Sequence, residues 1–299
     1  YEYDLCVFGG GSGGLAAAKQ AAHLGAKVAL FDYVTPSPQG SKWGIGGTCV
    51  NVGCVPKKLM HYAALLGAGM EDAKNLGWKV GDEPEHDWAT LVEKVQNHIK
   101  MLNFGYRVGL KSAKVTYINA LARLGEDGHT VTYEKRGETV TTSAAKICIS
   151  VGGRPTIPDD VPGAKEYAIT SDDIFSLNRP PGKTLVVGAA YIALECAGFL
   201  NELGYNTTIA VRSILLRGFD QQCAEKIGEV MEAQGCKFVR GTVVRSIVKA
   251  DDGKLEVTLI DSKTGEERLC DKFDTVMYAT GRTPCTRDIG LKEAGRKTH

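Results

Sequence analysis

Residues 3–14 read YDLCVFGGGSGG, a short apolar run followed by a turn rich in glycine. The residues after it, LAAAKQAA at 15–22, are strong helix formers, and a second apolar run at 27–31 ends at Asp32. This order predicts a strand, a glycine turn, a helix and a second strand. Such a succession is typical of the start of a dinucleotide-binding βαβ unit.

Three glycines of this turn, Gly9, Gly11 and Gly14, have the G-x-G-x-x-G spacing of the dinucleotide fingerprint. The first permits a tight turn, the second lets a pyrophosphate approach the backbone, and the third lets the helix pack closely on the strand. Asp32 is placed to accept hydrogen bonds from a ribose, although an aspartate in a solvated turn gives the same sequence signal. We therefore predict a dinucleotide with an unphosphorylated ribose, such as FAD, at this unit.

The same pattern begins again in the middle of the chain. An apolar run leads into a turn and an apolar helix over residues 183–203, and a further run follows at 205–211. Gly188, Ala190 and Ala193 occupy the three fingerprint positions, and because alanine replaces two of the glycines the motif is weak by itself. The repeat predicts a second dinucleotide-type unit in series with the first.

Basic residues follow the last run of the second unit, at the position where the first unit has Asp32. Arg212, Ser213 and Arg217 supply two guanidinium groups and a hydroxyl. These groups suit a 2′-phosphate, because charge-assisted hydrogen bonds favour a dianion and an acid would repel it. Exposed basic residues that bind no ligand are the alternative. The two units thus predict different cofactors, FAD at the first and NADPH at the second.

The remaining patterns complete the prediction of an α/β protein with two Rossmann-like dinucleotide-binding domains. Apolar residues recur at three- and four-residue spacing around 57–70 and 88–106, which predicts two neighbouring helices. Residues 114–150 alternate in the manner of antiparallel strands. We assign residues 1–154 to an FAD-binding domain, 155–285 to an NADPH-binding domain and 286–299 to a return of the chain toward the first domain.

Composition and charge narrow the classes of partner. The chain has 299 residues, a net charge of +1 and 24% charged residues, so no overall field attracts nucleic acid or an anionic membrane. Its apolar runs fall short of the ~20 residues that a membrane-spanning helix needs. We expect a globular chain that binds neither nucleic acid nor membrane. We also expect a cytoplasmic location, with a mitochondrial one as the alternative if a leader preceded Tyr1.

Two of the nine cysteines, Cys49 and Cys54, lie close together in the segment GGTCVNVGCVPKK at 46–58. A structural zinc site needs four ligands, and since no second Cys/His pair stands at suitable spacing we predict no metal. Two thiols about one helical turn apart can form a redox disulfide, and a helix beginning near Cys49 together with Lys57 and Lys58 favours a thiolate. From the residues alone, two inert thiols remain the alternative.

Segment 46–58 is similar to the redox motif of the pyridine nucleotide–disulfide oxidoreductases. Within that family, segments 34–44, 171–177 and 211–220 resemble the high-molecular-weight, animal-type thioredoxin reductases, and the resemblance covers residues 1–291. It implies a glutathione reductase-like fold with FAD and NADPH as cofactors. It further implies a homodimeric parent enzyme that reduces thioredoxin or another small disulfide substrate.

The resemblance also implies roles for single residues. Cys54 is the thiol next to the flavin and Cys49 is the interchange thiol. Lys57 lies near flavin N5 and pairs with Glu195, while Tyr191 gates the nicotinamide pocket. Electrons would pass from NADPH to the flavin, to the Cys49–Cys54 disulfide and then to an acceptor disulfide. The predicted cofactor-binding residues are Gly9, Gly11, Ser12, Gly13, Gly14, Asp32, Tyr33, Gly47, Thr48, Lys57, Ala120, Gly152, Gly188, Ala189, Ala190, Tyr191, Ile192, Glu195, Arg212, Ser213, Arg217 and Gly281.

The end of the chain departs from the family pattern. Family members continue into an interface domain that supplies a His-Pro motif, and none of the six histidines here precedes a proline. We therefore expect a C-terminally truncated chain that lacks the interface domain and is inactive as a fragment. Three alternatives stay open: glutathione reductase, a fused thioredoxin–glutathione reductase, and a non-catalytic nucleotide-binding fragment.

Overall fold

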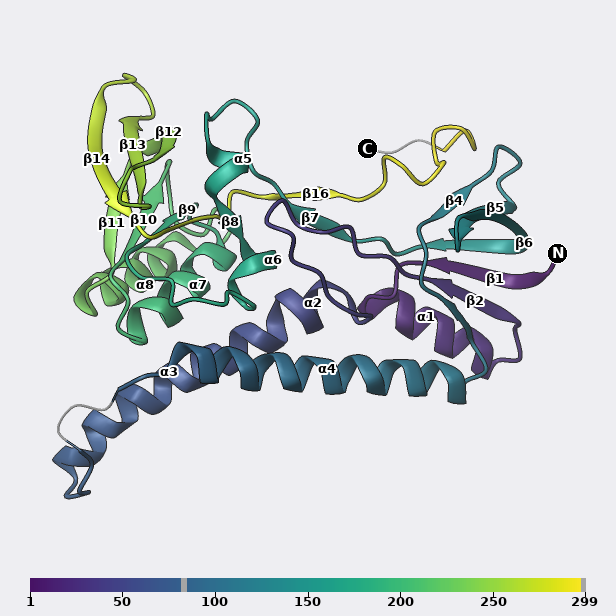
Figure 1. Cartoon of the computed structure of the whole chain (residues 1–299), viewed down its shortest axis with the longest axis horizontal. Coiled ribbons are helices and arrows are strands. Elements are labelled where there is room, and N and C mark those ends of the chain that lie inside the picture. Colours follow the sequence, from purple (N-terminus) through teal and green to yellow (C-terminus); the bar gives the residue numbers. More distant parts are fainter. Residues whose placement is uncertain (82–84, 297–299) are drawn as a thin grey trace.

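The computed structural model describes residues 1–81 and 85–296 and shows two α/β units side by side (Figure 1). The first unit has a six-stranded sheet and the second a five-stranded sheet with parallel strands. This arrangement is the fold class that the two glycine turns predict. The last three residues of the predicted segment 286–299 lie outside the described residues, and the domain boundaries stay predictions.

The first unit has the strand order β3-β2-β1-β6-β5-β4. β1 pairs in parallel with β2 and β6, and β4 to β6 form an antiparallel meander. The antiparallel prediction for residues 114–150 is wrong for β3, which pairs in parallel with β2. Parallel pairing needs a long crossover connection, and here the helices α2, α3 and α4 lie between the two strands in the chain. The elements are β1 (Tyr3–Phe8), α1 (Ser12–His23), β2 (Val28–Phe31), α2 (Gly47–Val52), α3 (Cys54–Asn75), α4 (Trp88–Ser112), β3 (Thr116–Ile118), β4 (Ala122–Leu124), β5 (Thr130–Lys135) and β6 (Glu138–Ile149).

The second unit has the strand order β11-β10-β9-β15-β8. An antiparallel sheet of β12 to β14 covers one face of it, and α7 and α8 cover the other. A ribbon of β7 (Gly153–Pro155) and β16 (Arg282–Pro284) joins the units, and we call it the connecting ribbon. The other elements are α5 (Ala164–Tyr167), β8 (Ile169–Thr170), α6 (Ser171–Ile174), β9 (Thr184–Val187), α7 (Tyr191–Glu202), β10 (Thr207–Val211), α8 (Gln221–Ala233), β11 (Lys237–Arg240), β12 (Thr242–Lys249), β13 (Leu255–Asp261), β14 (Glu267–Phe273) and β15 (Thr275–Tyr278).

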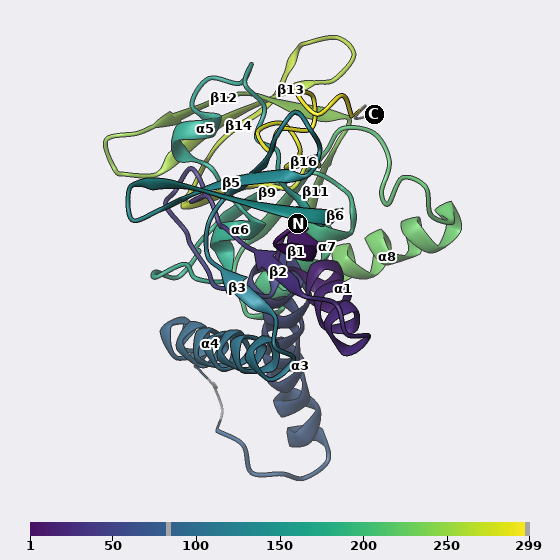
Figure 2. The same ribbon diagram turned by 90° about the vertical axis from the view of Figure 1, so that its right-hand side faces the viewer.

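The long helices α3 and α4 connect the two units on the side opposite β12 to β14 (Figures 1 and 2). Met60 of α3 and Trp88 of α4 share one apolar core with Phe175 and Phe199 of the second unit. The Trp88 indole N–H donates to the carbonyl oxygen of Leu177 at 2.9 Å. Although α3 and α4 have 22 and 25 residues, no helix in the described part of the chain is long and apolar enough to cross a membrane.

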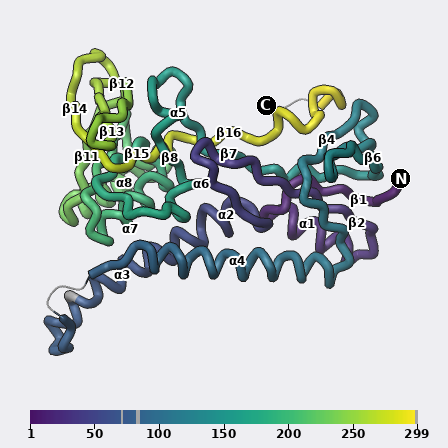
Figure 3. Tube along the Cα trace, in the orientation of Figure 1, coloured from purple at the N-terminus to yellow at the C-terminus, as the bar shows by residue number. Residues whose placement is uncertain are grey.

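The chain returns to the first unit after β16, as the yellow end of the trace shows (Figure 3). The backbone N–H of Leu124 donates to the carbonyl oxygen of Ile289 at 2.9 Å. Ile289 and Leu291 pack in the same apolar core as Tyr3 and Phe8. The segment that follows β16 therefore packs into the apolar core of the first unit.

Substitution of Gly14 tests the packing of α1 on β1. A Cβ there would lie 1.8 Å from the carbonyl oxygen of Gly9, so we expect Gly14→Ala to lower the free energy of unfolding by about 2 kcal/mol or more, measured by urea denaturation. Gly67→Ala in α3 is the control, because an added Cβ there meets nothing within 4 Å and alanine favours a helix by up to ~1 kcal/mol. Equal stabilities of the two variants would contradict this packing.

Candidate functional site

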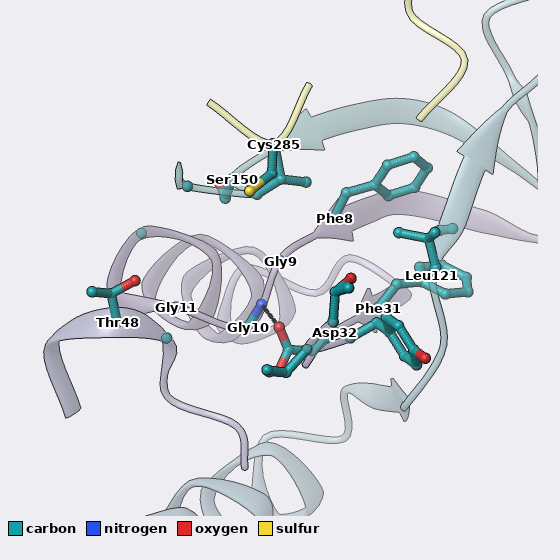
Figure 4. Close-up of a pocket in the computed structure, with 18 of the residues that line it drawn as sticks. Phe8, Gly9, Gly10, Gly11, Phe31, Asp32, Thr48, Leu121, Ser150 and Cys285 are labelled. Atoms are coloured by element: carbon teal, nitrogen blue, oxygen red, sulfur yellow. Dashed lines mark hydrogen bonds between the residues drawn. The ribbon is translucent and has the colours of Figure 1, made fainter. Parts of the chain in front are cut away.

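A first cavity of about 530 Å³ opens at the carboxyl ends of β1 and β2, beside the N-terminus of α1 (Figure 4). Two of the residues predicted for FAD, Gly14 and Lys57, lie outside its wall, and Gly14 instead packs against the turn at Gly9. The structure brings the other predicted residues together along the wall: Gly9, Gly11, Ser12, Gly13, Asp32, Tyr33, Gly47, Thr48, Ala120 and Gly152.

The turn before α1 fits a phosphate group. Gly11 caps the helix without a side-chain hydrogen bond, so the amides of the first turn are free to donate to an anion. Gly47 has φ +72, and a Cβ on it would lie 2.6 Å from the Cα of Gly11. Glycine at both positions lets two backbones meet at the edge of the cavity and leaves room for a diphosphate.

Asp32 supplies the acidic group of this cavity. Its carboxylate oxygen Oδ1 accepts from the backbone N–H of Gly10 at 2.8 Å (Figure 4). Burial raises the pKa of Asp32, and the hydrogen bond from Gly10 partly opposes this rise. The carboxylate can accept hydrogen bonds from ribose hydroxyls, as the sequence predicts. The glycine cradle and this acid together fit the adenosine diphosphate half of FAD.

The two cysteines of the predicted redox pair differ in position. Cys49 of α2 lines the first cavity, whereas Cys54 begins α3, is exposed and lies outside the wall. Both are free thiols. Burial and the neighbouring Cys54 thiol raise the pKa of Cys49, and the charge of Lys57 lowers it. The structure therefore brings Cys49 to the cavity, and the separate roles of the two thiols stay predictions.

The predicted ion pair between Lys57 and Glu195 is present. The Lys57 ammonium lies 2.6 Å from the Oε2 atom of Glu195 and links α3 of the first unit to α7 of the second. The side chains are 28% and 40% exposed, so water screens the pair and it adds little to stability. Its position, one turn after Cys54 and one turn after the start of α7, is what matters for the site.

A second cavity of about 660 Å³ opens at the N-terminus of α7. Ala190 caps that helix without a side-chain hydrogen bond, and the Arg217 guanidinium donates to the Ser213 hydroxyl at 2.8 Å. Tyr191, Ile192 and Glu195 lie outside the wall, with Tyr191 exposed. The predicted residues that line the cavity are Gly188, Ala189, Ala190, Arg212, Ser213, Arg217 and Gly281. Free amides and two arginines fit a dinucleotide that carries a 2′-phosphate.

Several residues of the first cavity were not predicted from the sequence. Trp43, Arg154, Cys285 and Ile289 line it. Trp43 lies close to the redox segment, but Cys285 and Ile289 reach the wall only through the return of the chain after β16, and no local pattern signals that path. Within the described ranges 1–81 and 85–296, no group of three His, Cys, Asp or Glu side chains is arranged to hold a metal ion.

Comparison with known proteins gives three findings. The chain is 58% identical over 286 residues to a thioredoxin reductase of Plasmodium falciparum (isolate FCH-5), covering 94% of this chain and 51% of that protein. It is 53% identical over 299 residues to thioredoxin reductase SEP1 of Emiliania huxleyi, covering 99% and 59%. The solved Cu(II) complex of the flavoprotein disulfide reductase RclA from Escherichia coli matches with a TM-score of 0.83 at 21% identity, covering 100% of this chain and 61% of that one.

The chain thus spans about half the length of the curated relatives that it matches. The likeness to the solved structure concerns the fold alone. Over residues 3–299 the sequence matches the family described as pyridine nucleotide-disulphide oxidoreductase. With this match over nearly its whole length, the chain belongs to the pyridine nucleotide-disulphide oxidoreductase family.

Proposed function

We propose that this protein is an NADPH-dependent thioredoxin reductase of the high-molecular-weight type, with FAD in the first cavity and NADPH in the second. One observation carries the proposal: Cys49 lies in the wall of the first cavity, next to Cys54. The Lys57–Glu195 ion pair then connects this redox segment to the helix that begins at the second cavity. A pair of thiols at the wall of one dinucleotide cavity, linked through this ion pair to the helix at the other, is suited to receive electrons from a nicotinamide once oxidised to a disulfide.

The residues of each cavity would hold one cofactor. The amides of α1 and the bare backbone at Gly11 would bind the FAD diphosphate, and Asp32 would orient its ribose. Arg212 and Arg217 would bind the 2′-phosphate of NADPH. Bound FAD supplies two-electron transfer between a nicotinamide and a disulfide.

The thiols would carry the exchange with the substrate. Two electrons from NADPH and two protons break the Cys49–Cys54 bond and give two thiols. The Cys49 thiolate attacks the acceptor disulfide, breaks its S–S bond and forms a mixed disulfide while one acceptor thiolate leaves. Cys54 then attacks the Cys49 sulfur, which restores the internal disulfide and releases the second acceptor thiol. Lys57 assists by favouring the thiolate at Cys49.

The relatives support thioredoxin as the acceptor, because both proteins compared above are named thioredoxin reductase. We propose a homodimer and a cytoplasmic location for the whole protein. A parallel assay of NADPH oxidation by the whole protein, with thioredoxin and with glutathione disulfide, tests the acceptor. A faster reaction with glutathione disulfide would overturn this choice.

Anaerobic NADPH titration of the FAD-loaded chain tests the path of electrons. We expect a long-wavelength absorbance band from a thiolate beside the flavin. Cys54→Ser should abolish the band and Cys49→Ser should keep it, because Cys54 is proposed as the thiol next to the flavin. Cys223→Ser, exposed on α8, is the control. If only the Cys49→Ser variant lost the band, the two roles would be reversed.

Loss of either arginine tests the phosphate site. We expect Arg212→Ala and Arg217→Ala each to raise the Kd for NADP+ by about tenfold or more and the Kd for NAD+ by less than about twofold, because each removes a charge-assisted bond to the 2′-phosphate. Isothermal titration calorimetry measures both constants. Lys226→Ala removes an exposed cation of α8 that pairs with Glu229 and serves as the control. Equal weakening of both nucleotides would place the arginines elsewhere on the ligand.

Alkylation of Cys49 tests the influence of Lys57. The charge of Lys57 lowers the pKa of Cys49 against the effect of burial, so Lys57→Met should raise this pKa. A smaller fraction of thiolate then reacts at any pH below it, and the rate profile for iodoacetamide shifts to higher pH. Mass spectrometry of the Cys49 peptide gives the rate. Lys58→Met is the matched control, and an equal shift in both variants would argue against a specific effect of Lys57.

A further inference from the structure

The connecting ribbon carries two arginines, and one of them, Arg154, pairs with an aspartate of the second unit. The Arg154 Nε atom donates to the Oδ2 atom of Asp172 in α6 at 2.7 Å. Burial raises the pKa of Asp172, and the charges of Arg154 and Arg282 both oppose the rise. The Asp172 side chain is 2% exposed. A nearly dry carboxylate is therefore paired with the Arg154 guanidinium, and Arg282 stands on the strand that pairs with that of Arg154.

Arg154 also contacts the loop at 33–44, which we call the cavity loop. Its Nη1 atom donates to the carbonyl oxygen of Thr35 at 2.6 Å, and its guanidinium lies 4.6 Å from the ring centroid of Trp43. Thr35, Trp43 and Arg154 all line the first cavity. A second contact holds the same loop, because the Ser37 hydroxyl donates to the carboxylate of Asp173 at 2.5 Å.

Arg282 makes the corresponding connection to the redox segment. Its Nη2 atom donates to the Thr48 hydroxyl at 3.2 Å and also to the carbonyl oxygen of Gly153. Thr48 immediately precedes Cys49 in α2. We call Asp172, Arg154 and Arg282 the cluster. It joins three parts of the site: the cavity loop, the start of α2 and the edge of the second unit.

Stability alone does not account for this cluster. Among buried side-chain atoms of the described chain, the Oδ1 atom of Asp172 and the Nη1 atom of Arg282 have no hydrogen-bond partner. Buried polar atoms without partners cost free energy, and a buried ion pair is weak support for a fold. Removing one partner is nevertheless costly, since it leaves an uncompensated buried charge. Such a cluster is suited to fix one arrangement of its neighbours.

We propose that Asp172 is a positioning residue that acts through Arg154 to fix the cavity loop relative to the second unit, while Arg282 on the paired strand holds the Thr48–Cys49 segment. The inference deepens the proposed function and rests on it for its purpose, because electron transfer between two cofactors and a disulfide needs all three in register. Its structural content, the fixing of the loop and of α2, is independent of any cofactor.

The test uses the whole chain without cofactors. Asp172→Asn leaves the guanidinium charges uncompensated at nearly constant size, and Arg154→Lys removes the fork that bonds Asp172 and Thr35 together. We expect both variants to speed tryptic cleavage after Lys42, which is exposed in the cavity loop, by about fivefold or more through local opening. Alkylation of Cys49 should speed up as well. Peptide mass spectrometry follows both sites.

Val257→Ala is the matched control, because Val257 is fully buried in the core of the second unit and away from the loop. A merely structural role of Asp172 predicts that Val257→Ala, compared at equal loss of stability, accelerates cleavage after Lys42 as much as Asp172→Asn does. That result, or unchanged cleavage in both cluster variants, would overturn the proposal.

The FAD-loaded chain gives a second readout. No residue of the cluster lines the second cavity, so the Kd for NADP+ should stay within about twofold of the parent in Asp172→Asn, while the FAD dissociation rate rises by about fivefold or more because a wall of its cavity loosens. An equal loss of NADP+ binding would overturn the inference. Failure of the parent chain to bind either nucleotide would instead count against the proposed function. The rate of cleavage after Lys42 would then still test the positioning role of Asp172.

Discussion

Met60 and Trp88 of the first unit bury their side chains against Phe175 and Phe199 of the second, and this shared core holds the two units against each other. Large side chains of this kind stabilise by roughly 1.5–3 kcal/mol each when fully buried. The half-exposed Lys57–Glu195 pair contributes at most about 1 kcal/mol. Apolar packing therefore holds the units together, and the ion pair at its edge is left free to serve the redox segment.

The fold was predictable where its signals are local. The turns at 9–14 and 188–193 can each be predicted from about 30 residues of chain, because a strand, a glycine or alanine turn and a helix follow one another in order. The periodicity of 57–70 and 88–106 was informative in the same way, and the structure shows the two predicted helices in contact. Periodicity predicts that a helix has an apolar face, but not which element packs against that face. The core shared with α7 could therefore not be predicted from the sequence.

The site was harder to predict wherever it depends on distant segments. Cys285 and Ile289 line the first cavity because the chain returns after β16, and Asp172 of α6 meets Arg154 of the connecting ribbon, 18 residues away in the chain. None of these contacts follows a spacing rule. Tyr191 shows the opposite case: the resemblance assigns it to the nicotinamide pocket, yet it lies exposed outside the wall of the second cavity, and its gating role stays a prediction.

Flavin binding and thiolate formation place opposed requirements on the surroundings of Cys49. A wall that excludes water is needed to hold a flavin, but the same burial raises the pKa of the thiol and disfavours the nucleophilic thiolate. Lys57 lowers this pKa by less than burial raises it, and its ammonium is paired with Glu195 on α7. The reactivity of a thiol in the first unit thus depends on a carboxylate of the second. Packing of the two units and chemistry at Cys49 are therefore coupled, and a change that separates α3 from α7 alters both.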